Sequence, residues 1–541
     1  MKNILPFPRP LDGHRRPATT AAACLLAALL GLAPAAGRAA GALTVCTEAS
    51  PDTLDVAQSE AAVTVDAIGN TVFDQLVMYR RGTTELVPGL AQTWAISPDG
   101  LSYTLQLRPG VKFHTTPWFK PTRDLNADDV VFSFARLAEK KGAWHDAAPI
   151  GFQMWHSTGM ADAIRRVEKV DAMTVRLILT KPMAPMLSLL ANAFTSSVIS
   201  AEYGAQLLKA GKPEQLNTQP VGTGPFQFRS YQKDAVMRLG ANPQYWGSKP
   251  QIDQLVFAIT PDASVRVQRL KAGECLVGAN MRGETISALE GTSVKVDAAP
   301  GLLTGYIALN TQHKFLSDVR FRQALALAFD RRSFIQSVYG GRAQPAAAFL
   351  PPLLWGHNAD LKPRFDPEQA KALVKAAGYD GTELTIFTRI GGSIDGKRAA
   401  ELMQADWARV GVKVRVQMME WGEMLRRTGA GDHDITFLNW AGDADPDNFF
   451  SPNLSCEAIP AGGNKSRWCN KAFDAVIDKA RGLNDQAERT KLYQLAQRMI
   501  YDEAPLIPTV YPQYFTAVSE KVQGFKSSPF ADLDFRGVAL P

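Results

Sequence analysis

An acidic loop in the last third of the chain has the clearest capacity for chemistry. Asp443 is the first of three aspartates that follow the apolar stretch Ile435–Asn439, which predicts a strand, and Trp440 stands at the end of that stretch. A carboxylate and an aromatic ring at a strand end suit an ammonium group, through a charge-assisted hydrogen bond and a cation–π contact. Asp443, Trp440 and Gly442 between them are therefore candidate ligand-binding residues. The alternative is an Asp-Pro turn with Trp440 in the core.

The same loop begins like a calcium-binding loop but departs from that pattern. It lacks the glycine that the sixth position requires, and Leu454 stands where the twelfth position requires an acid. We therefore expect no metal ion there.

A glycine-rich turn offers a candidate anion site. Residues 391–398 read Gly-Gly-Ser-Ile-Asp-Gly-Lys-Arg and lie between a predicted strand, Leu384–Phe387, and a predicted helix, Arg398–Val410. The nucleotide-binding pattern fails at its last position, where Arg398 replaces Ser or Thr. Beside Arg389, such a turn at a helix N-terminus suits a carboxylate; the alternative is a surface turn with solvated basic side chains.

Signatures of enzymes and of nucleic-acid binding are missing from the sequence. It contains neither H-E-x-x-H nor G-x-S-x-G, and its seven histidines are scattered. Aromatic residues do not alternate with a basic stripe, as a binder of RNA or single-stranded DNA would require. These patterns favour a binding protein without catalytic residues or cofactor, and no nucleic-acid partner.

The elements that must position these residues read as strands in the first half and as alternating strands and helices in the second. The predicted strands are Leu43–Cys46, Tyr103–Leu107, Val170–Leu179, Phe226–Phe228, Ala235–Leu239, Gln254–Ile259, Tyr306–Asn310, Leu384–Phe387, Val412–Gln417 and Ile435–Asn439. The predicted helices are Val130–Leu137 with Asn126 as its cap, Arg320–Phe329, Pro367–Ala377, Arg398–Val410, Lys471–Arg481 and Asp485–Asp502. This order predicts an α/β protein with at least one mixed sheet. Trp421, just past Val412–Gln417, is a candidate for lining a cleft, with core packing as the alternative.

The N-terminal 40 residues have the composition of an export signal. The chain has 541 residues and a net charge of +6, of which residues 1–40 carry 5 − 1 = +4. A basic start, an apolar run over Ala21–Ala36 and small residues at 39–42 are typical of a cleaved secretory signal peptide. An uncleaved anchor helix is the alternative. We predict a cleaved signal peptide over residues 1–40 and an exported mature protein; the resemblance given below places it in the periplasm.

The cysteine content agrees with export. Apart from Cys24 in the leader, the chain has Cys46, Cys275, Cys456 and Cys469. In an oxidising compartment four cysteines favour two disulfides, with three possible pairings. Cys456 and Cys469 lie close together around a glycine-rich stretch, and their pairing leaves Cys46 with Cys275. Zinc is the alternative, but no CxxC motif and no nearby histidine support it.

Several sequence motifs, taken together and in this order, resemble those of a known protein family. They are Pro88–Ala91 with Trp94, Ser97–Gly100, Leu107–His114, Phe119–Arg123, Leu125–Phe134, Gly222–Phe226, Thr260–Arg266 and Asp445–Phe450. The chain resembles the periplasmic dipeptide-binding proteins of bacterial ABC transporters, in the peptide/nickel/opine solute-binding family (family 5). The resemblance covers essentially the whole mature chain.

The resemblance implies a two-lobed periplasmic binding protein of the large, three-domain type (cluster C, class II), with mixed sheets and a hinge. Residues 41–73, 222–300 and 514–541 would form one lobe, 74–221 an inserted domain, and 301–513 the other lobe. The family's disulfides are similar to the pairs Cys46–Cys275 and Cys456–Cys469.

The resemblance also implies a ligand and partners. In dipeptide receptors an aspartate after a strand-end tryptophan binds the peptide ammonium, and Asp443 and Trp440 match these positions. An arginine before the matching helix binds the peptide carboxylate; here the loop is shorter, and Arg389 is the candidate substitute. The implied partners are a short peptide and a membrane permease, with the receptor a monomer. Alternatives are a relative that takes antimicrobial peptides, haem or another small solute, and a secreted hydrolase.

Overall fold

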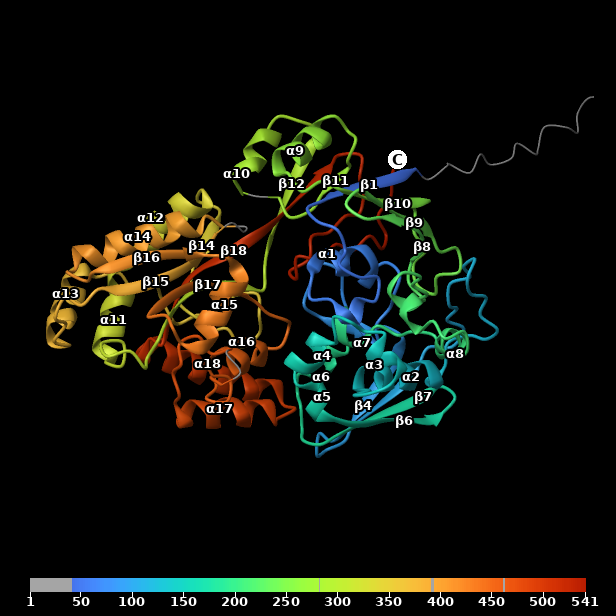
Figure 1. The fold of residues 1–541 in the computed structure, drawn as a ribbon, viewed down its shortest axis with the longest axis horizontal. Coiled ribbons are helices and arrows are strands. Elements are labelled where there is room, and N and C mark those ends of the chain that lie inside the picture. The colour runs from blue at the N-terminus through green and yellow to red at the C-terminus, as the bar shows by residue number, and fades with distance from the viewer. Residues whose placement is uncertain (1–40, 282, 391–393, 461–462) are drawn as a thin grey trace, which may run out of the picture. The chain divides into compact units, whose positions relative to one another are not determined.

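The computed structural model describes residues 41–281, 283–390, 394–460 and 463–541 (Figure 1). The predicted signal peptide and the first three residues of the glycine-rich turn therefore lie outside the described residues.

The sheets confirm an α/β fold with mixed strand directions. Twelve strands form one sheet: β1 (Ala42–Thr47), β8 (Phe226–Gln232), β9 (Val236–Ala241), β10 (Gln254–Ile259), β11 (Val277–Gly278), β12 (Val294–Pro300), β13 (Leu303–Leu309), β14 (Ala343–Pro345), β15 (Leu384–Arg389), β16 (Val414–Met419), β17 (Ile435–Ala441) and β18 (Leu506–Ser519). A second sheet holds β4 (Ala91–Ile96), β5 (Ser102–Leu107), β6 (Ile164–Asp171) and β7 (Thr174–Leu179), and β2 (Val77–Tyr79) pairs with β3 (Leu86–Pro88).

Strand β18 joins the two ends of the large sheet. Its first half pairs with β13 and β14, and its second half pairs with β11 and β12 (Figure 1). The sequence analysis did not predict this 14-residue strand, because Pro508 and Pro512 interrupt its pattern. Pro508 lies beside a register shift in the pairing with β13, a kind of position where a strand tolerates proline.

Hydrophobic residues gather in separate cores on the two sides of β18. The largest core draws on residues between Leu43 and Ala279 and again between Val518 and Val538. Two further cores draw on residues between Leu302 and Val510. The C-terminal residues thus return to pack with the N-terminal part of the described chain.

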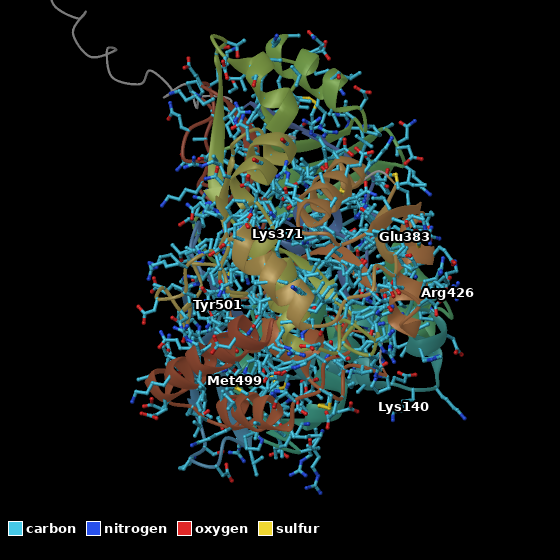
Figure 2. All side chains as sticks on the ribbon, turned by 90° about the vertical axis from the view of Figure 1, so that its left-hand side faces the viewer. Lys140, Lys371, Glu383, Arg426, Met499 and Tyr501 are labelled. Atoms are coloured by element: carbon cyan, nitrogen blue, oxygen red, sulfur yellow. A yellow bond between two sulfur atoms is a disulfide. The ribbon has the colours of Figure 1, made fainter. Side chains whose placement is uncertain are left out.

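The longer helices begin at a side-chain cap, except the one that follows Pro446. Those of eight residues or more are α2 (Ala127–Ala138), α8 (Ala201–Lys209), α9 (Ala263–Lys271), α11 (Val319–Ala328), α12 (Arg331–Tyr339), α13 (Pro367–Ala376), α14 (Gly396–Arg409), α15 (Trp421–Ala430), α16 (Asp447–Leu454), α17 (Lys471–Arg481) and α18 (Gln486–Glu503). Asn126 caps α2, as predicted, and Asp129 completes a capping box with it. Charged side chains such as Lys140, Lys371, Glu383 and Arg426 stay in solvent (Figure 2).

One predicted strand is wrong in its extent. Val170–Leu179 is a hairpin: β6 ends at Asp171 and β7 begins at Thr174. The Asp171 side chain accepts a hydrogen bond from the Met173 amide at 2.8 Å, which stabilises the turn between them.

Both predicted disulfides are confirmed. Cys46 on β1 bonds to Cys275 just before β11, and Cys456 bonds to Cys469 ahead of α17. Within the described ranges, no helix is both long and apolar enough to traverse a membrane.

Candidate ligand-binding site

Three strand ends bring the predicted site residues to one edge of the large sheet. Strand β15 runs parallel to β16 on one side and to β17 on the other, so their carboxyl ends share an edge. Arg389 is the last residue of β15, Trp421 opens α15 directly after β16, and Trp440 belongs to the end of β17. Ligands of α/β proteins bind at such carboxyl ends.

The backbone around Asp443 is held by the neighbouring strand. The Gly442 amide donates to the Leu302 carbonyl at 2.9 Å, which continues the β13–β17 ladder past its last pair. A Cβ atom at Gly442 would collide with the Phe449 ring, so the close packing here requires glycine. The Asp445 amide in turn donates to Asp443 Oδ1 at 2.9 Å. These contacts fix where the Asp443 carboxylate lies.

Asp443 is the acid of this loop without a cationic partner among the described residues. Its side chain is partly exposed, yet protein atoms surround it closely enough that burial, with repulsion from Asp445 and Asp447, raises its pKa to about 7. Among the described residues no Lys, Arg or His forms an ion pair with it. A carboxylate of this kind gains much from an incoming cation.

The other two aspartates of the loop are paired. Arg489 on α18 donates to both oxygens of Asp445, at 2.8 and 2.9 Å. Arg481 on α17 lies 3.1 Å from Asp447. Asp445 and Asp447 are buried, so these pairs belong to the core of the protein rather than to its binding surface. The calcium interpretation rejected from the sequence finds no support in this geometry.

Comparison with known proteins agrees with this arrangement. Residues 85–460 match the bacterial extracellular solute-binding proteins, family 5. The chain belongs to this family. It is 49% identical over 517 residues to di/tripeptide-binding protein 4 of Pseudomonas aeruginosa, covering 94% of this chain and 97% of that protein. Two solved structures are also similar: HbpA2 of Haemophilus parasuis (TM-score 0.87, 38% identity, 93% of this chain and 100% of that one), and the dipeptide-binding protein of Pseudoalteromonas sp. SM9913 with Met-Leu (TM-score 0.79, 35%, 92% and 100%).

Family membership settles the broad class of the protein. A family 5 protein is a solute-binding receptor, and the family is not one of enzymes. The two-lobed binding-protein fold expected from the sequence is confirmed by the similarity to these solved structures.

Trp440 packs partly against the core in this family 5 receptor. Its indole nitrogen donates to the Asn448 side chain at 3.1 Å, and its ring packs against one of the two cores between Leu302 and Val510. The side chain is nevertheless only half-buried, so part of the ring remains available beside Asp443.

The predicted anion side of the receptor brings Arg389 and Trp421 into contact. The Arg389 guanidinium carbon lies 4.8 Å from the centroid of the Trp421 ring, and Trp421 is 38% exposed. Trp421 is therefore not a core residue. At the start of α14 the Asp395 side chain caps the helix by accepting from the Arg398 amide at 3.0 Å, so one of the amides available to an anion is already satisfied.

One residue near Asp443 was missed by the sequence analysis. Burial raises the pKa of the Tyr79 hydroxyl above its usual value, and the negative charge of Asp443 is the next largest cause. Tyr79 lies 364 positions before Asp443, and a lone tyrosine at the end of a short strand gives no local signal of such a contact.

Proposed function

We propose that this chain is the extracytoplasmic receptor of an ABC importer and that its ligands are di- and tripeptides. The relatives named for di/tripeptide and dipeptide binding align over more than nine-tenths of the chain, which supports this ligand class.

The observation that carries the proposal is the unpaired Asp443. A buried charge is costly unless it is paired, and the described residues supply arginines to Asp445 and Asp447 but none to Asp443. The α-ammonium group of the peptide is the cation that pairs with the Asp443 carboxylate. The half-buried Trp440 and the fixed turn at Gly442 hold the carboxylate in place for it.

The peptide carboxylate pairs with Arg389. Its guanidinium stands at the same sheet edge and lies over the Trp421 ring, which restricts its orientation. An ammonium anchor and a carboxylate anchor at a set separation select for peptide length. Side chains between them then face a tolerant, partly solvated space.

The remaining features of the proposal concern the whole receptor. Residues 1–40 form a signal peptide that is removed on export to the periplasm. Residues 41–73, 222–300 and 514–541 form one lobe, 74–221 an insertion, and 301–513 the other lobe. The separate cores support the division between the two lobes, and one shared core joins the insertion to the first lobe. The mature protein acts as a monomer and delivers the peptide to a membrane permease.

Calorimetry with a panel of di- and tripeptides tests the proposal. The mature protein should bind unmodified dipeptides with a dissociation constant in the micromolar range or tighter, and N-acetylated dipeptides far more weakly. Asp443→Asn should lose this binding, whereas Asp162→Asn, at an exposed aspartate of the first half, should keep it. Failure to bind any peptide would reject the proposal. A haem titration followed by absorbance checks the alternative ligand.

A further inference from the structure

Tyr79 occupies a constrained place in the described structure. It ends the short strand β2, and its ring lies 4.4 Å from that of Phe530, centroid to centroid. The hydroxyl oxygen is buried, although the rest of the side chain is partly exposed. It makes no hydrogen bond of normal geometry within the described residues, even though Ser188 and the backbone of Ala444 are close by.

The partner ring of Tyr79 belongs to a segment that touches both sides of the fold. Phe530 packs against a core formed by residues after Leu302, and the Leu302 amide donates to the Pro529 carbonyl at 2.9 Å. A few residues later, Leu533 and Phe535 are buried in the core of the N-terminal part. Tyr79 therefore lies where the C-terminal segment connects the core of the N-terminal part with the core formed by residues after Leu302.

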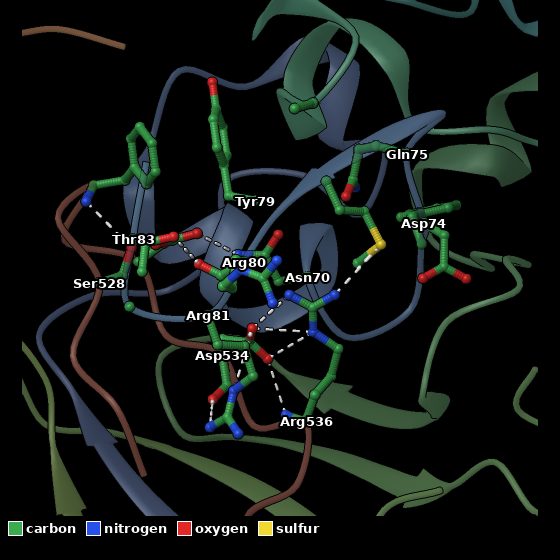
Figure 3. A pocket seen from close by; sticks show the side chains of 16 residues that line it. Asn70, Asp74, Gln75, Tyr79, Arg80, Arg81, Thr83, Ser528, Asp534 and Arg536 are labelled. Atoms are coloured by element: carbon green, nitrogen blue, oxygen red, sulfur yellow. Dashed lines mark hydrogen bonds and ion pairs between the residues drawn. The ribbon is translucent and has the colours of Figure 1, made fainter. Parts of the chain in front are cut away.

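The charged groups on the other side of the Tyr79 ring are already satisfied by one another. A cavity of about 50 Å³ there is lined by Arg81, Asp534 and Arg536 among others (Figure 3). Asp534 accepts from Arg536 and lies 3.6 Å from Arg81. The Tyr79 hydroxyl points away from this ion-pair cluster (Figure 3), and Asp443 and Asp445 both act electrostatically on it.

We propose that Tyr79 is a specificity-determining residue that recognises a primary ammonium group at the ligand's N-terminus. This rests on the proposed function, in which Asp443 neutralises that ammonium. Asp443 Oδ1 already accepts from the Asp445 amide, so a primary ammonium, with three N–H donors, needs an acceptor besides this carboxylate. The unpartnered Tyr79 hydroxyl supplies it.

The chemistry distinguishes peptides by the substitution of their first nitrogen. A primary ammonium has three donors and uses both Asp443 and Tyr79. An N,N-dimethylated ammonium keeps the charge but has a single N–H donor, which Asp443 takes, so the buried hydroxyl stays without its partner. The receptor should therefore prefer an unsubstituted N-terminus even among ligands of equal charge.

The test compares Ala-Ala with N,N-dimethyl-Ala-Ala by calorimetry. The unmodified protein should bind Ala-Ala about tenfold more tightly. Tyr79→Phe removes only the hydroxyl and should lower the affinity for Ala-Ala by about tenfold while leaving the affinity for N,N-dimethyl-Ala-Ala almost unchanged. Tyr339→Phe is the matched control, because it deletes another buried hydroxyl without a described partner, and it should change neither affinity.

Each contrary result has its own meaning. Equal affinity of the unmodified protein for the two ligands overturns the inference, and so does a Tyr79→Phe protein that keeps the tenfold preference. If the unmodified protein binds dipeptides and Tyr79→Phe binds them with the same affinities, the role of Tyr79 is wrong, but the role proposed for Asp443 stands. Absence of all peptide binding overturns the proposed function and the inference with it.

Discussion

The two ends of the loop between β17 and α16 differ in whether their aspartates are paired with arginines. At the α16 end, Asp445 and Asp447 are buried against Arg489 and Arg481. At the β17 end, Asp443 lies only a few residues away, yet no described cation reaches it and its pKa is raised to about 7.

Within a few residues, Asp445 and Asp447 therefore stabilise the fold, whereas Asp443 is left for binding. The paired acids tie the loop to α17 and α18, and removing either partner would leave a buried charge alone. The unpaired acid costs the empty protein some stability, which a ligand with an ammonium group restores on binding. Variants at the two ends should therefore fail in different ways.

The largest effect is expected at the paired end. Asp445→Asn leaves the Arg489 guanidinium buried without a counter-charge and should lower the free energy of unfolding by about 3–5 kcal/mol. Urea denaturation of the ligand-free protein at pH 7.5 measures this, with Asp162→Asn as the exposed control. A loss below about 1 kcal/mol would show that the pair does not act as described.

At the unpaired end, affinity should fall while the fold is kept. Asp443→Asn should weaken dipeptide binding by about 100-fold or more, because the ammonium loses its counter-charge. Calorimetry measures the affinity, and circular dichroism checks the fold. An unaltered affinity would remove Asp443 from the site.

A smaller loss is expected at Arg389. Arg389→Ala should lower the affinity for peptides with a free carboxylate by roughly tenfold, and should leave the affinity for C-terminally amidated peptides nearly unchanged. The comparison of the two ligand forms separates a lost charge contact from a general disturbance next to Trp421. Equal weakening of both forms would contradict the assignment.

The smallest effect concerns the stability of the empty protein. Because the folded pKa of Asp443 is raised above its unfolded value, the folded state binds more protons between pH 4 and pH 7. Its contribution to stability is therefore largest at low pH and is lost as the pH rises to about 7. Asp443→Asn should raise the melting temperature at pH 8 by about 1–3 °C, seen by calorimetric scanning. A lower melting temperature would contradict an unpaired Asp443.

The sequence and the structure agree where the pattern is local. Asp443 follows an apolar strand with an aromatic end, and Asn126 precedes two acids and an amphipathic run, so both were predictable from neighbours alone. In the same way, the number and spacing of the four cysteines favoured one of the three possible disulfide pairings, which is the pairing observed.

The residues that the sequence did not reveal act across long separations. Arg489 lies on a helix 44 positions after Asp445, and nothing in the pattern of that helix marks its arginine as a partner. Tyr79 and β18 are further cases, the first lacking any motif and the second interrupted by prolines. Contacts of this kind depend on how distant elements pack.

Proton release on binding tests the central claim, that the ligand provides the missing partner of Asp443. Calorimetry of dipeptide binding in buffers of different ionisation enthalpy counts the protons released. With a pKa of about 7, Asp443 should give up about half a proton at pH 7 and about 0.9 at pH 6, since it must ionise to pair with the ammonium. Binding without proton release at pH 6 would contradict the account.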